Sequence, residues 1–278
     1  VIALMGDDHI CESSTTSHQS EFAMIDAMIP FLNPSGVQEI LDYGIIGIEL
    51  SRKSGCWVGI KCVHDNVSSG ATVDLDENRV VLKDISDENY PSDGLNIRLK
   101  DTAQEKEFRL HHHKLRYVKE YCKLNNLNKL IFDPEKPRIG IISTGKSFLD
   151  TKLGLEKIGI NKEVANDIGI KFLKIAMPWP LEETVIEKFA ENLDKIIVVE
   201  EKRSIIETQV KEILFNKNLK VKVIGKKDEN SNDLFVSSGA LDPGEIGLKI
   251  YETIKYLQLP KDVTNFSMQL KSLTESTN

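Results

Sequence analysis

The stretch from residue 7 to residue 21, DDHICESSTTSHQSE, gathers side chains that can take up and release protons. Thirteen of its fifteen residues are polar, and Asp, Glu and His occur together, as they do in sites of general acid–base catalysis. We therefore predict acid–base roles for Asp8, His9 and His18. The alternative is a solvated surface loop without chemistry, which is the commoner case for a polar stretch.

The segments around this loop predict that it lies at the edge of a sheet. Residues 1–6, VIALMG, form a short apolar run that ends at Gly6, which indicates a buried strand. In open α/β sheets, ligands bind at the carboxyl ends of the strands. We expect the serine-rich stretch 13–17 to cap a helix over residues 21–28, because free N–H groups at a helix start suit a carboxylate. The predicted substrate-binding residues are Ser13, Ser14 and Gln19.

A second candidate site is GIISTGKS, residues 140–147, which matches the phosphate-loop pattern G-x-x-x-x-G-K-[ST] at every defined position. In a working phosphate loop the first Gly follows the strand, whereas Gly140 lies inside the apolar run RIGIIS. The two isoleucines after it are β-branched and favour extended backbone. Glu200 also stands where a magnesium-binding Asp is expected. We expect a strand–turn–helix junction and no Mg–ATP binding tighter than about millimolar; a phosphate-loop NTPase is the alternative.

The histidines and cysteines do not predict a metal site. The run HHH at 111–113 falls on a helix, where neighbours point about 100° apart and cannot converge on one ion. His9, Cys11 and His18 are suitable residue types for zinc, but no fourth ligand stands at motif spacing. The four cysteines form no C-x-x-C pair, which argues against disulfides or iron–sulfur clusters and favours a reducing cytoplasm.

The composition excludes some classes of partner. With 278 residues, 40% hydrophobic and 28% charged, the chain has a globular composition and enough length for two domains. The net charge of −7 comes without a basic stripe, so we expect no nucleic-acid partner. No apolar run approaches the ~20 residues that span a bilayer, so we expect no membrane partner. The chain opens without Met on a core-like strand, which we interpret as a fragment of a longer polypeptide.

The pattern along the chain predicts four regions. The last part of an α/β domain spans 1–65, a linker with a hairpin and a helix spans 66–136, a regular β/α domain spans 137–259, and a further linker spans 260–278. In the third region apolar strands alternate with helical segments, which predicts a mostly parallel sheet.

Local patterns predict more detail. The hairpin is expected over residues 71–83. A capping box of Ser204 and Glu207 is expected to start a helix in the third region. Another helix is expected near the start of the chain, over residues 35–51. Its predicted apolar face consists of Val37, Leu41, Gly44 and Ile48.

Longer stretches of the sequence resemble a known family. They include GDDHICESSTTSHQSEFAMIDAMIPFLNPSGVQEILDYG, RLHHHKL, PRIGIISTGKSFLD, MPWPLE and IIVVEEKRSIIETQVKEILFN. In this order they resemble the fused bacterial indolepyruvate ferredoxin oxidoreductases, which are thiamine-diphosphate-dependent 2-oxoacid:ferredoxin oxidoreductases. The resemblance covers essentially the whole chain. It implies an α/β fold in which residues 1–65 end a pyrimidine-binding-type domain, residues 137–259 form a transketolase C-terminal-like domain with a mostly parallel sheet, and residues 260–278 lead to a missing cofactor-binding domain.

The resemblance also implies a reaction, cofactors and partners. Indolepyruvate or a related 2-oxo acid is decarboxylated on thiamine diphosphate and oxidised to an acyl-CoA, and the electrons pass through iron–sulfur clusters to ferredoxin. The implied partners are the remaining domains of the enzyme, ferredoxin, the 2-oxo acid and coenzyme A, and the complete enzyme is expected to be a homo-oligomer. The resemblance does not give the role of each loop residue; from their place in the first helical turn we expect His18 and Gln19 to hydrogen-bond the keto oxygen of the substrate or to order the loop. The alternative is that the loop docks against the missing domains and only supports the fold.

Parts of the family's machinery are not found in this sequence. The G-D-G…N segment that holds the diphosphate and Mg²⁺ has a near match at residues 6–8, but Asp8 stands where the second Gly is needed. The glutamate that activates the pyrimidine ring is expected before Val1, and the cysteine arrays for clusters are absent. We therefore expect the chain alone to bind none of these cofactors and to be inactive. A non-catalytic interaction module with the same fold is a further alternative.

Overall fold

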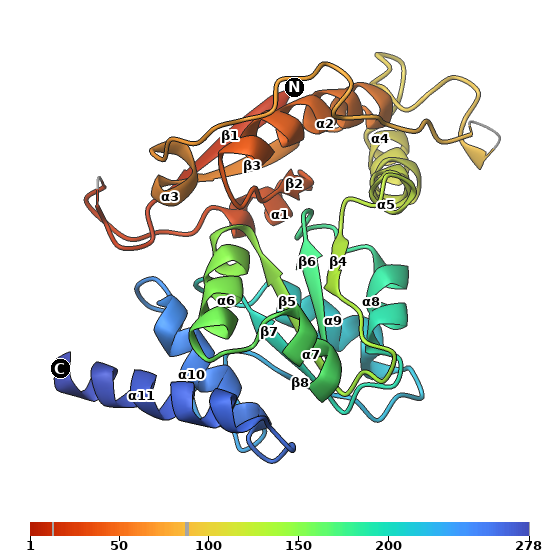
Figure 1. Ribbon diagram of the computed structural model, residues 1–278. Coiled ribbons are helices and arrows are strands. Elements are labelled where there is room, and N and C mark those ends of the chain that lie inside the picture. Colours follow the sequence, from red (N-terminus) through yellow and green to blue (C-terminus); the bar gives the residue numbers. More distant parts are fainter. Residues whose placement is uncertain (13, 87–88, 278) are drawn as a thin grey trace. The chain divides into compact units, whose positions relative to one another are not determined.

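The chain forms two compact units (Figure 1). The computed structural model describes residues 1–12, 14–86 and 89–277. Unit 1 consists of Val1–Asn128 and Ala176–Glu182, and unit 2 consists of Lys129–Ile175 and the residues from Glu183 onward. The assignment of sequence-defined domains within these units stays a prediction. No helix in the described part of the chain is long and apolar enough to cross a bilayer.

Unit 1 contains a parallel sheet with the strand order β1-β3-β2. The strand predicted over residues 1–6 is confirmed as β1 (Ile2–Asp7), the apolar run CWVGIKCV forms β3 (Val58–Val63), and β2 is the short pair Phe31–Leu32. Because β1 and β3 are parallel, with Asp7 beside Val63, their carboxyl ends lie at one edge of the sheet. The helices of this unit are α1 (Glu21–Asp26), α2 (Val37–Ser54), α3 (His64–Val67), α4 (Ala103–Arg109), the π-helical turn η2 (Leu110–Lys114) and α5 (Leu115–Leu124).

Helix α2 forms as predicted but buries a different face. Leu41 and Ile48 of the predicted face are 36% and 46% exposed. The buried residues are Tyr43, Ile46, Gly47, Leu50, Ser51 and Ser54. Gly47 lets the helix lie close to the sheet, because a Cβ atom there would come 3.0 Å from Ile2 Cδ1. Apolar residues occur on both sides of α2, so periodicity alone does not tell which side faces the sheet.

Residues 71–83 do not form the predicted hairpin. A turn is present, since the N–H of Arg79 bonds to the carbonyl three residues earlier, but the flanking residues pair with no strand. Side chains of α2 hold this segment instead. Gln38 exchanges two hydrogen bonds with the main chain of Asp74, and Arg79 forms an ion pair with Asp42 at 2.9 Å. The main-chain N–H and C=O of Asp74, which a hairpin could pair across its strands, are therefore hydrogen-bonded to Gln38 of α2.

Unit 2 contains a sheet with the strand order β4-β6-β5-β7-β8. The predicted mostly parallel sheet is confirmed by β5 (Ile139–Thr144), β6 (Ile170–Ile175), β7 (Lys195–Val199) and β8 (Lys222–Ile224). The antiparallel edge strand β4 (Lys129–Phe132) occurs near the end of the stretch 66–136, which the sequence predicts to be a linker. The helices of this unit are α6 (Gly145–Lys157), α7 (Lys162–Ile168), α8 (Glu183–Ala190), α9 (Ile206–Phe215), α10 (Pro243–Ile254) and α11 (Lys261–Thr277).

Most of the stretch predicted as a C-terminal linker, 260–278, forms helix α11. Val263 and Ser267, about one helical turn apart, are buried. The ring of Phe266 lies so close to Gly159 that a Cβ atom there would come within 2.7 Å of it. The helix therefore packs onto unit 2 through one face. Its role as a connection to a further domain stays a prediction.

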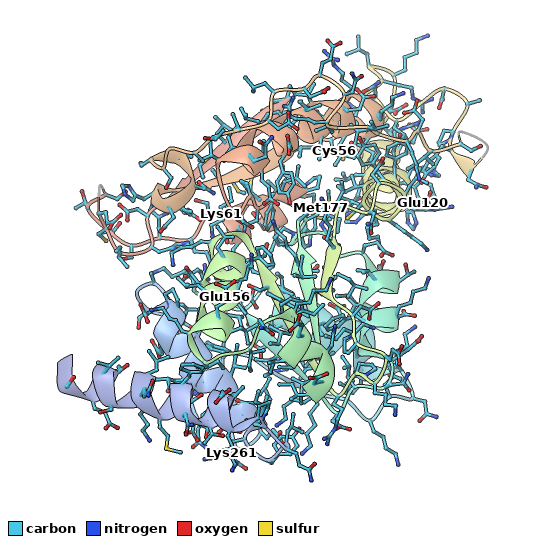
Figure 2. All side chains as sticks on the ribbon, viewed as in Figure 1. Cys56, Lys61, Glu120, Glu156, Met177 and Lys261 are labelled. Atoms are coloured by element: carbon cyan, nitrogen blue, oxygen red, sulfur yellow. The ribbon has the colours of Figure 1, made fainter. Side chains whose placement is uncertain are left out.

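A short segment from later in the sequence completes unit 1. Between β6 and α8 of unit 2, the segment Ala176–Glu182 belongs to unit 1. The N–H of Phe31 donates to the carbonyl of Trp179 at 3.0 Å, beside β2. Met177, labelled in Figure 2, is fully buried in the same apolar cluster as residues of α2 and β3. The core of unit 1 therefore includes residues from two distant parts of the sequence.

Candidate functional site

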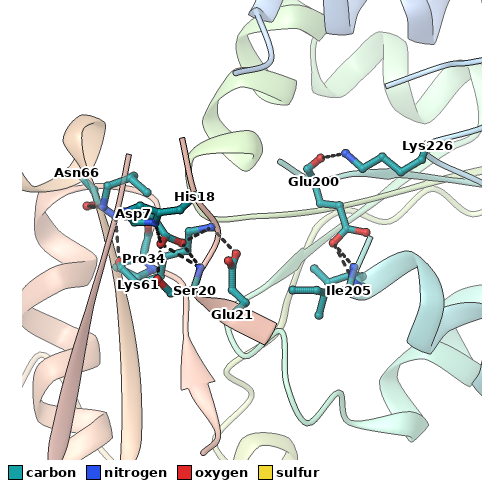
Figure 3. Close-up of polar contacts among 12 residues, drawn as sticks. Asp7, His18, Ser20, Glu21, Pro34, Lys61, Asn66, Glu200, Ile205 and Lys226 are labelled. Atoms are coloured by element: carbon teal, nitrogen blue, oxygen red, sulfur yellow. Dashed lines mark hydrogen bonds and ion pairs between the residues drawn. The ribbon is translucent and has the colours of Figure 1, made fainter. Parts of the chain in front are cut away.

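Asp7, at the carboxyl end of β1, is the centre of a buried polar cluster (Figure 3). Its side chain is fully buried. Oδ1 accepts hydrogen bonds from the N–H of Ser20 at 3.0 Å and from Ser20 Oγ at 2.5 Å, and it lies 2.9 Å from His18 Nδ1. Strand β1 thus ends in a carboxylate to which the last part of the loop 7–21 is tied.

Lys61 of β3 supplies positive charge to this cluster. Its Nζ lies 3.5 Å from Asp7 Oδ2 and donates to Glu21 Oε1 at the start of α1. The Lys61 side chain is 3% exposed, so the two carboxylates, rather than water, balance its charge. The second oxygen of Glu21, Oε2, is buried and has no hydrogen-bond partner among the described residues. It is an acceptor that an N–H or O–H group of a ligand or a water molecule would satisfy.

The electrostatics of the cluster favour an ionised Asp7. Burial alone would raise the pKa of Asp7, because the carboxylate loses its water. The Lys61 charge and the hydrogen bonds from Ser20 act in the opposite direction and prevail, so the pKa of Asp7 is lowered from its usual 3.8. Asp7 is therefore an anion at neutral pH.

His18 connects this buried charge with the surface. Its side chain is 43% exposed, and its ring contacts Asp7 through Nδ1. When Nδ1 carries the proton it donates to Asp7, which leaves Nε2 for acid–base chemistry. A buried carboxylate that holds an imidazole by Nδ1 is the arrangement of the Asp–His pair in serine hydrolases. The structure thus brings the predicted residue His18 together with a carboxylate, Asp7, to which the sequence assigned no specific role.

The other predicted site residues lie in the loop with different surroundings. Asp8 is buried, and its two oxygens accept main-chain N–H groups of the loop at 2.9 and 2.8 Å, the second from Ser14. His9 is buried and Gln19 is half-buried. Ser13 lies outside the described residues. The roles predicted for these residues stay predictions, and the contacts of Asp8 favour ordering of the loop over acid–base chemistry.

The helix that follows the loop begins differently from the prediction. Helix α1 starts at Glu21, and Ser20, not the stretch 13–17, occupies its N-cap position. The hydroxyl and the N–H of Ser20 bind Asp7. With six residues, α1 is shorter than the predicted helix. Asp7 therefore binds the residue that precedes the first turn of α1.

Lys61 and Glu21 are functional candidates that the sequence prediction missed. Lys61 is the single charged residue in the apolar strand CWVGIKCV, and a buried lysine needs a counter-charge. That signal indicates an ion pair but not its partner, because Glu21 is 40 positions away along the chain.

The segment GIISTGKS forms the predicted strand–turn–helix junction. Gly140 lies within β5, and the chain turns at Gly145, which has a left-handed φ of 52°. Lys146, the residue that would contact phosphates in a phosphate loop, is engaged by protein groups. Its Nζ lies 2.5 Å from Asp150 Oδ2 and 3.5 Å from Glu201 Oε1. The backbone path and the engaged lysine both argue against the NTPase alternative.

Gly140 has a packing role that accounts for the first glycine of this pattern. A Cβ atom at Gly140 would come 2.6 Å from Phe189 Cε1 and from Leu193 Cδ1, both in buried side chains. Gly140→Ala should therefore destabilise unit 2 by about 1–3 kcal/mol through overpacking. Gly44→Ala is the control, because nothing lies within 4 Å of that position; it should be neutral or stabilising by up to about 1 kcal/mol. Urea denaturation measures both, and equal stability of the two variants contradicts the packing role.

Glu200, which follows β7, caps helix α9 inside unit 2 (Figure 3). Its oxygens accept the N–H groups of residues 205–207 at 3.0, 2.9 and 3.0 Å. Lys226 Nζ donates to its main-chain carbonyl at 2.6 Å. Burial raises the pKa of Glu200, and the three N–H groups and Lys226 offset part of that rise. The predicted capping box of Ser204 and Glu207 is therefore wrong, because the Glu200 carboxylate accepts the N–H groups at the start of α9.

The residues considered for metal binding form no group of ligands in the described part of the chain. Within residues 1–12, 14–86 and 89–277, no three His, Cys, Asp or Glu side chains are grouped as metal ligands. The HHH run falls on η2, where His111 and His112 are exposed and His113 packs against Phe108 with ring centroids 5.6 Å apart. The four cysteines are free thiols. That the chain binds no metal stays a prediction.

Comparisons with known proteins agree with one another. A family model described as the indolepyruvate oxidoreductase domain matches residues 129–277, more than half of the chain. The indolepyruvate oxidoreductase subunit IorA of Pyrococcus abyssi is 26% identical over 230 residues, which cover 81% of this chain and 34% of the relative. The subunit of the same name from Archaeoglobus fulgidus is 27% identical over 218 residues, covering 76% and 32%. The chain thus spans about a third of the length of these curated relatives.

Solved structures share the fold. A 2-oxoglutarate:ferredoxin oxidoreductase from Magnetococcus marinus, with 2-oxoglutarate, coenzyme A and succinyl-CoA bound, superposes with a TM-score of 0.54 at 14% identity, over 90% of this chain and 48% of that chain. A split-gene transketolase, described as an inactive beta4 tetramer, gives 0.50 at 10% identity, over 91% and 66%. At these identities the likeness concerns the fold alone, a mixed α/β architecture with a mostly parallel sheet.

Proposed function

The chain belongs to the indolepyruvate oxidoreductase family, and on that basis we propose that it is part of an enzyme that oxidatively decarboxylates indolepyruvate or related 2-oxo acids. The proposed product is an acyl-CoA and the proposed electron acceptor is ferredoxin. Ferredoxin in the name of the solved relative, and its bound coenzyme A and succinyl-CoA, support this choice. The proposed location is the cytoplasm, where the four free thiols stay reduced.

The described residues do not fit the cofactors that the family implies. A diphosphate–Mg²⁺ site needs several oxygen ligands, and an iron–sulfur cluster needs four thiolates as a rule. The described residues contain no such grouping, and Cys56 and Cys122 are buried thiols in the apolar core of unit 1. We propose that other parts of the enzyme hold thiamine diphosphate, Mg²⁺ and the clusters, and that the chain alone is inactive.

The Asp7–His18 pair is the observation that supports a direct role of this chain in the reaction. In the proposed role, His18 Nε2–H donates a hydrogen bond to the keto oxygen of the 2-oxo acid. This bond strengthens as negative charge develops on that oxygen, so it stabilises the transition state more than the ground state. The buried Asp7 orients the ring and compensates the charge of the doubly protonated imidazole. Gln19, the next residue, is the proposed second donor to the same oxygen.

The test compares the complete polypeptide that carries this sequence with the 278-residue chain alone. Both receive indolepyruvate, coenzyme A, thiamine diphosphate, Mg²⁺ and a viologen dye as electron acceptor. The complete enzyme should release carbon dioxide and reduce the dye, and the chain alone should do neither. A complete enzyme without activity toward any aryl 2-oxo acid would overturn the proposed function in favour of a non-catalytic interaction module. Carbon dioxide released by the chain alone would overturn the proposed inactivity.

A further inference from the structure

Lys61 is a charged residue at a strand position where an apolar side chain would be expected. It is buried in β3, next to the core residue Ile60. Replacing a buried ion pair by well-packed apolar residues is often neutral or stabilising, because burying the charges costs much of what their attraction contributes. The stability of the sheet therefore does not account for a lysine at this position.

The two oxygens of Asp7 divide their contacts between Lys61 and His18. Oδ1 faces His18 Nδ1 and Ser20 Oγ, at 2.9 and 2.5 Å. Oδ2 faces Lys61 Nζ at 3.5 Å, and the N–H of Ser20 lies 3.0 and 3.1 Å from the two oxygens. The carboxylate therefore stands between the lysine and the imidazole.

We infer that Lys61 is a positioning residue that keeps Asp7 ionised, so that Asp7 holds His18 by Nδ1 and leaves Nε2 for the substrate. The inference rests on the proposed function, in which Nε2 acts on the keto oxygen. Glu21 fixes the lysine from the other side, because its Oε1 accepts a hydrogen bond from Nζ and prevents the flexible side chain from turning away from Asp7.

The groups that face Asp7 come from three parts of unit 1. Strand β3 contributes Lys61, helix α1 contributes Glu21, and the loop contributes His18 and the neutral donor Ser20. Removing the lysine leaves two buried carboxylates near each other with only His18 and hydrogen-bond donors to compensate them. A carboxylate that loses an opposite charge within 4–6 Å rises in pKa by about 1–3.

The experiment follows the carboxyl carbon of Asp7 by ¹³C NMR while the 278-residue chain is titrated. In the parent chain no inflection is expected above about pH 4, and in Lys61→Met the inflection should move upward by about one pH unit or more. Lys61→Arg keeps the charge and should restore most of the parent behaviour. Glu21→Gln is the matched control: it removes a carboxylate but keeps a side-chain oxygen that accepts the hydrogen bond from Lys61 Nζ, so the Asp7 inflection should not rise.

The outcomes separate a positioning role from a merely structural ion pair. If folded Lys61→Met leaves the Asp7 titration within about 0.3 pH unit of the parent, the inference is overturned. Circular dichroism reports folding, and Lys61→Gln, which keeps most of the length of the side chain, replaces Lys61→Met if that variant does not fold.

A second readout links the inference to catalysis. In the complete enzyme, Lys61→Met should move the acid limb of the kcat/KM profile to higher pH by the amount seen in the NMR titration. An NMR shift without any 2-oxo acid turnover in the parent enzyme would support the coupling of Lys61 and Asp7 while refuting the proposed function. Turnover in the parent enzyme without an NMR shift in Lys61→Met would refute the coupling and leave the proposed function standing.

Discussion

Replacing His18 by Gln in the complete enzyme is expected to lower kcat with indolepyruvate by about 10²-fold or more. Gln has a similar reach but forms no cation, so the charge-assisted hydrogen bond to the keto oxygen is lost. Asp7→Asn should have an effect at least as large, because the amide no longer compensates the imidazolium and no longer specifies which ring nitrogen carries the proton. Steady-state kinetics of the two variants measure both effects.

Asp8→Asn is the matched control in the same loop. Both oxygens of Asp8 accept main-chain N–H groups, and Asn keeps one acceptor, so we expect a loss of less than about tenfold. A loss as large as that of His18→Gln would show that Asp8 is catalytic, as its sequence context suggests. Turnover of His18→Gln within about threefold of the parent would show instead that the whole loop is scaffold.

Glu200→Ala is expected to destabilise unit 2 by about 3–5 kcal/mol, the largest stability effect that we predict. The change leaves three buried N–H groups at the start of α9 without their acceptor, and each such group costs about 1–3 kcal/mol. It also removes a negative charge beside Lys226, whose pKa is lowered by burial. Urea denaturation followed by circular dichroism measures the loss of free energy of unfolding.

Asp242→Ala is the comparison, because Asp242 caps α10 in the same unit from an exposed position. Its Oδ1 accepts the N–H groups of Gly244 and Glu245 at 2.7 and 3.1 Å. An N-cap of this kind is worth about 1 kcal/mol. If Glu200→Ala costs no more than Asp242→Ala, burial does not strengthen the Glu200 cap, and the predicted difference is refuted.

Much of the fold of unit 2 could be predicted because its signals are local. RIGIIS, IKFLKIA and KIIVVEE are apolar runs between helical segments, and each became a strand of the sheet. Strand β4 was missed because it is a short edge strand that exists by pairing with β6, some forty residues later. The hairpin prediction was wrong although the local pattern suits a hairpin. Contacts with a distant element decide the structure, because Asp74 bonds to Gln38 and Arg79 pairs with Asp42, both on α2.

The candidate site could be predicted in part. The polarity of the loop and its place after a strand indicated His18, and both are properties of a continuous stretch of sequence. The buried cluster beside His18 could not be found in this way, because Asp7, Lys61 and Glu21 come together only when β1, β3 and α1 are assembled. Within the loop, Asp7 contacts the imidazole of His18, whereas Asp8, for which an acid–base role stays a prediction, accepts main-chain N–H groups.

The segment Ala176–Glu182 determines when unit 1 can complete its fold during synthesis. A ribosome makes the chain from its N-terminus, so β4, β5 and β6 of unit 2 leave the exit tunnel before these residues do. Until then, the N–H of Phe31 lacks the carbonyl of Trp179, and the apolar cluster around Leu50 lacks Met177. The core of unit 1 is therefore completed only after the first strands of unit 2 have been synthesised, and until then part of its apolar surface lacks a partner.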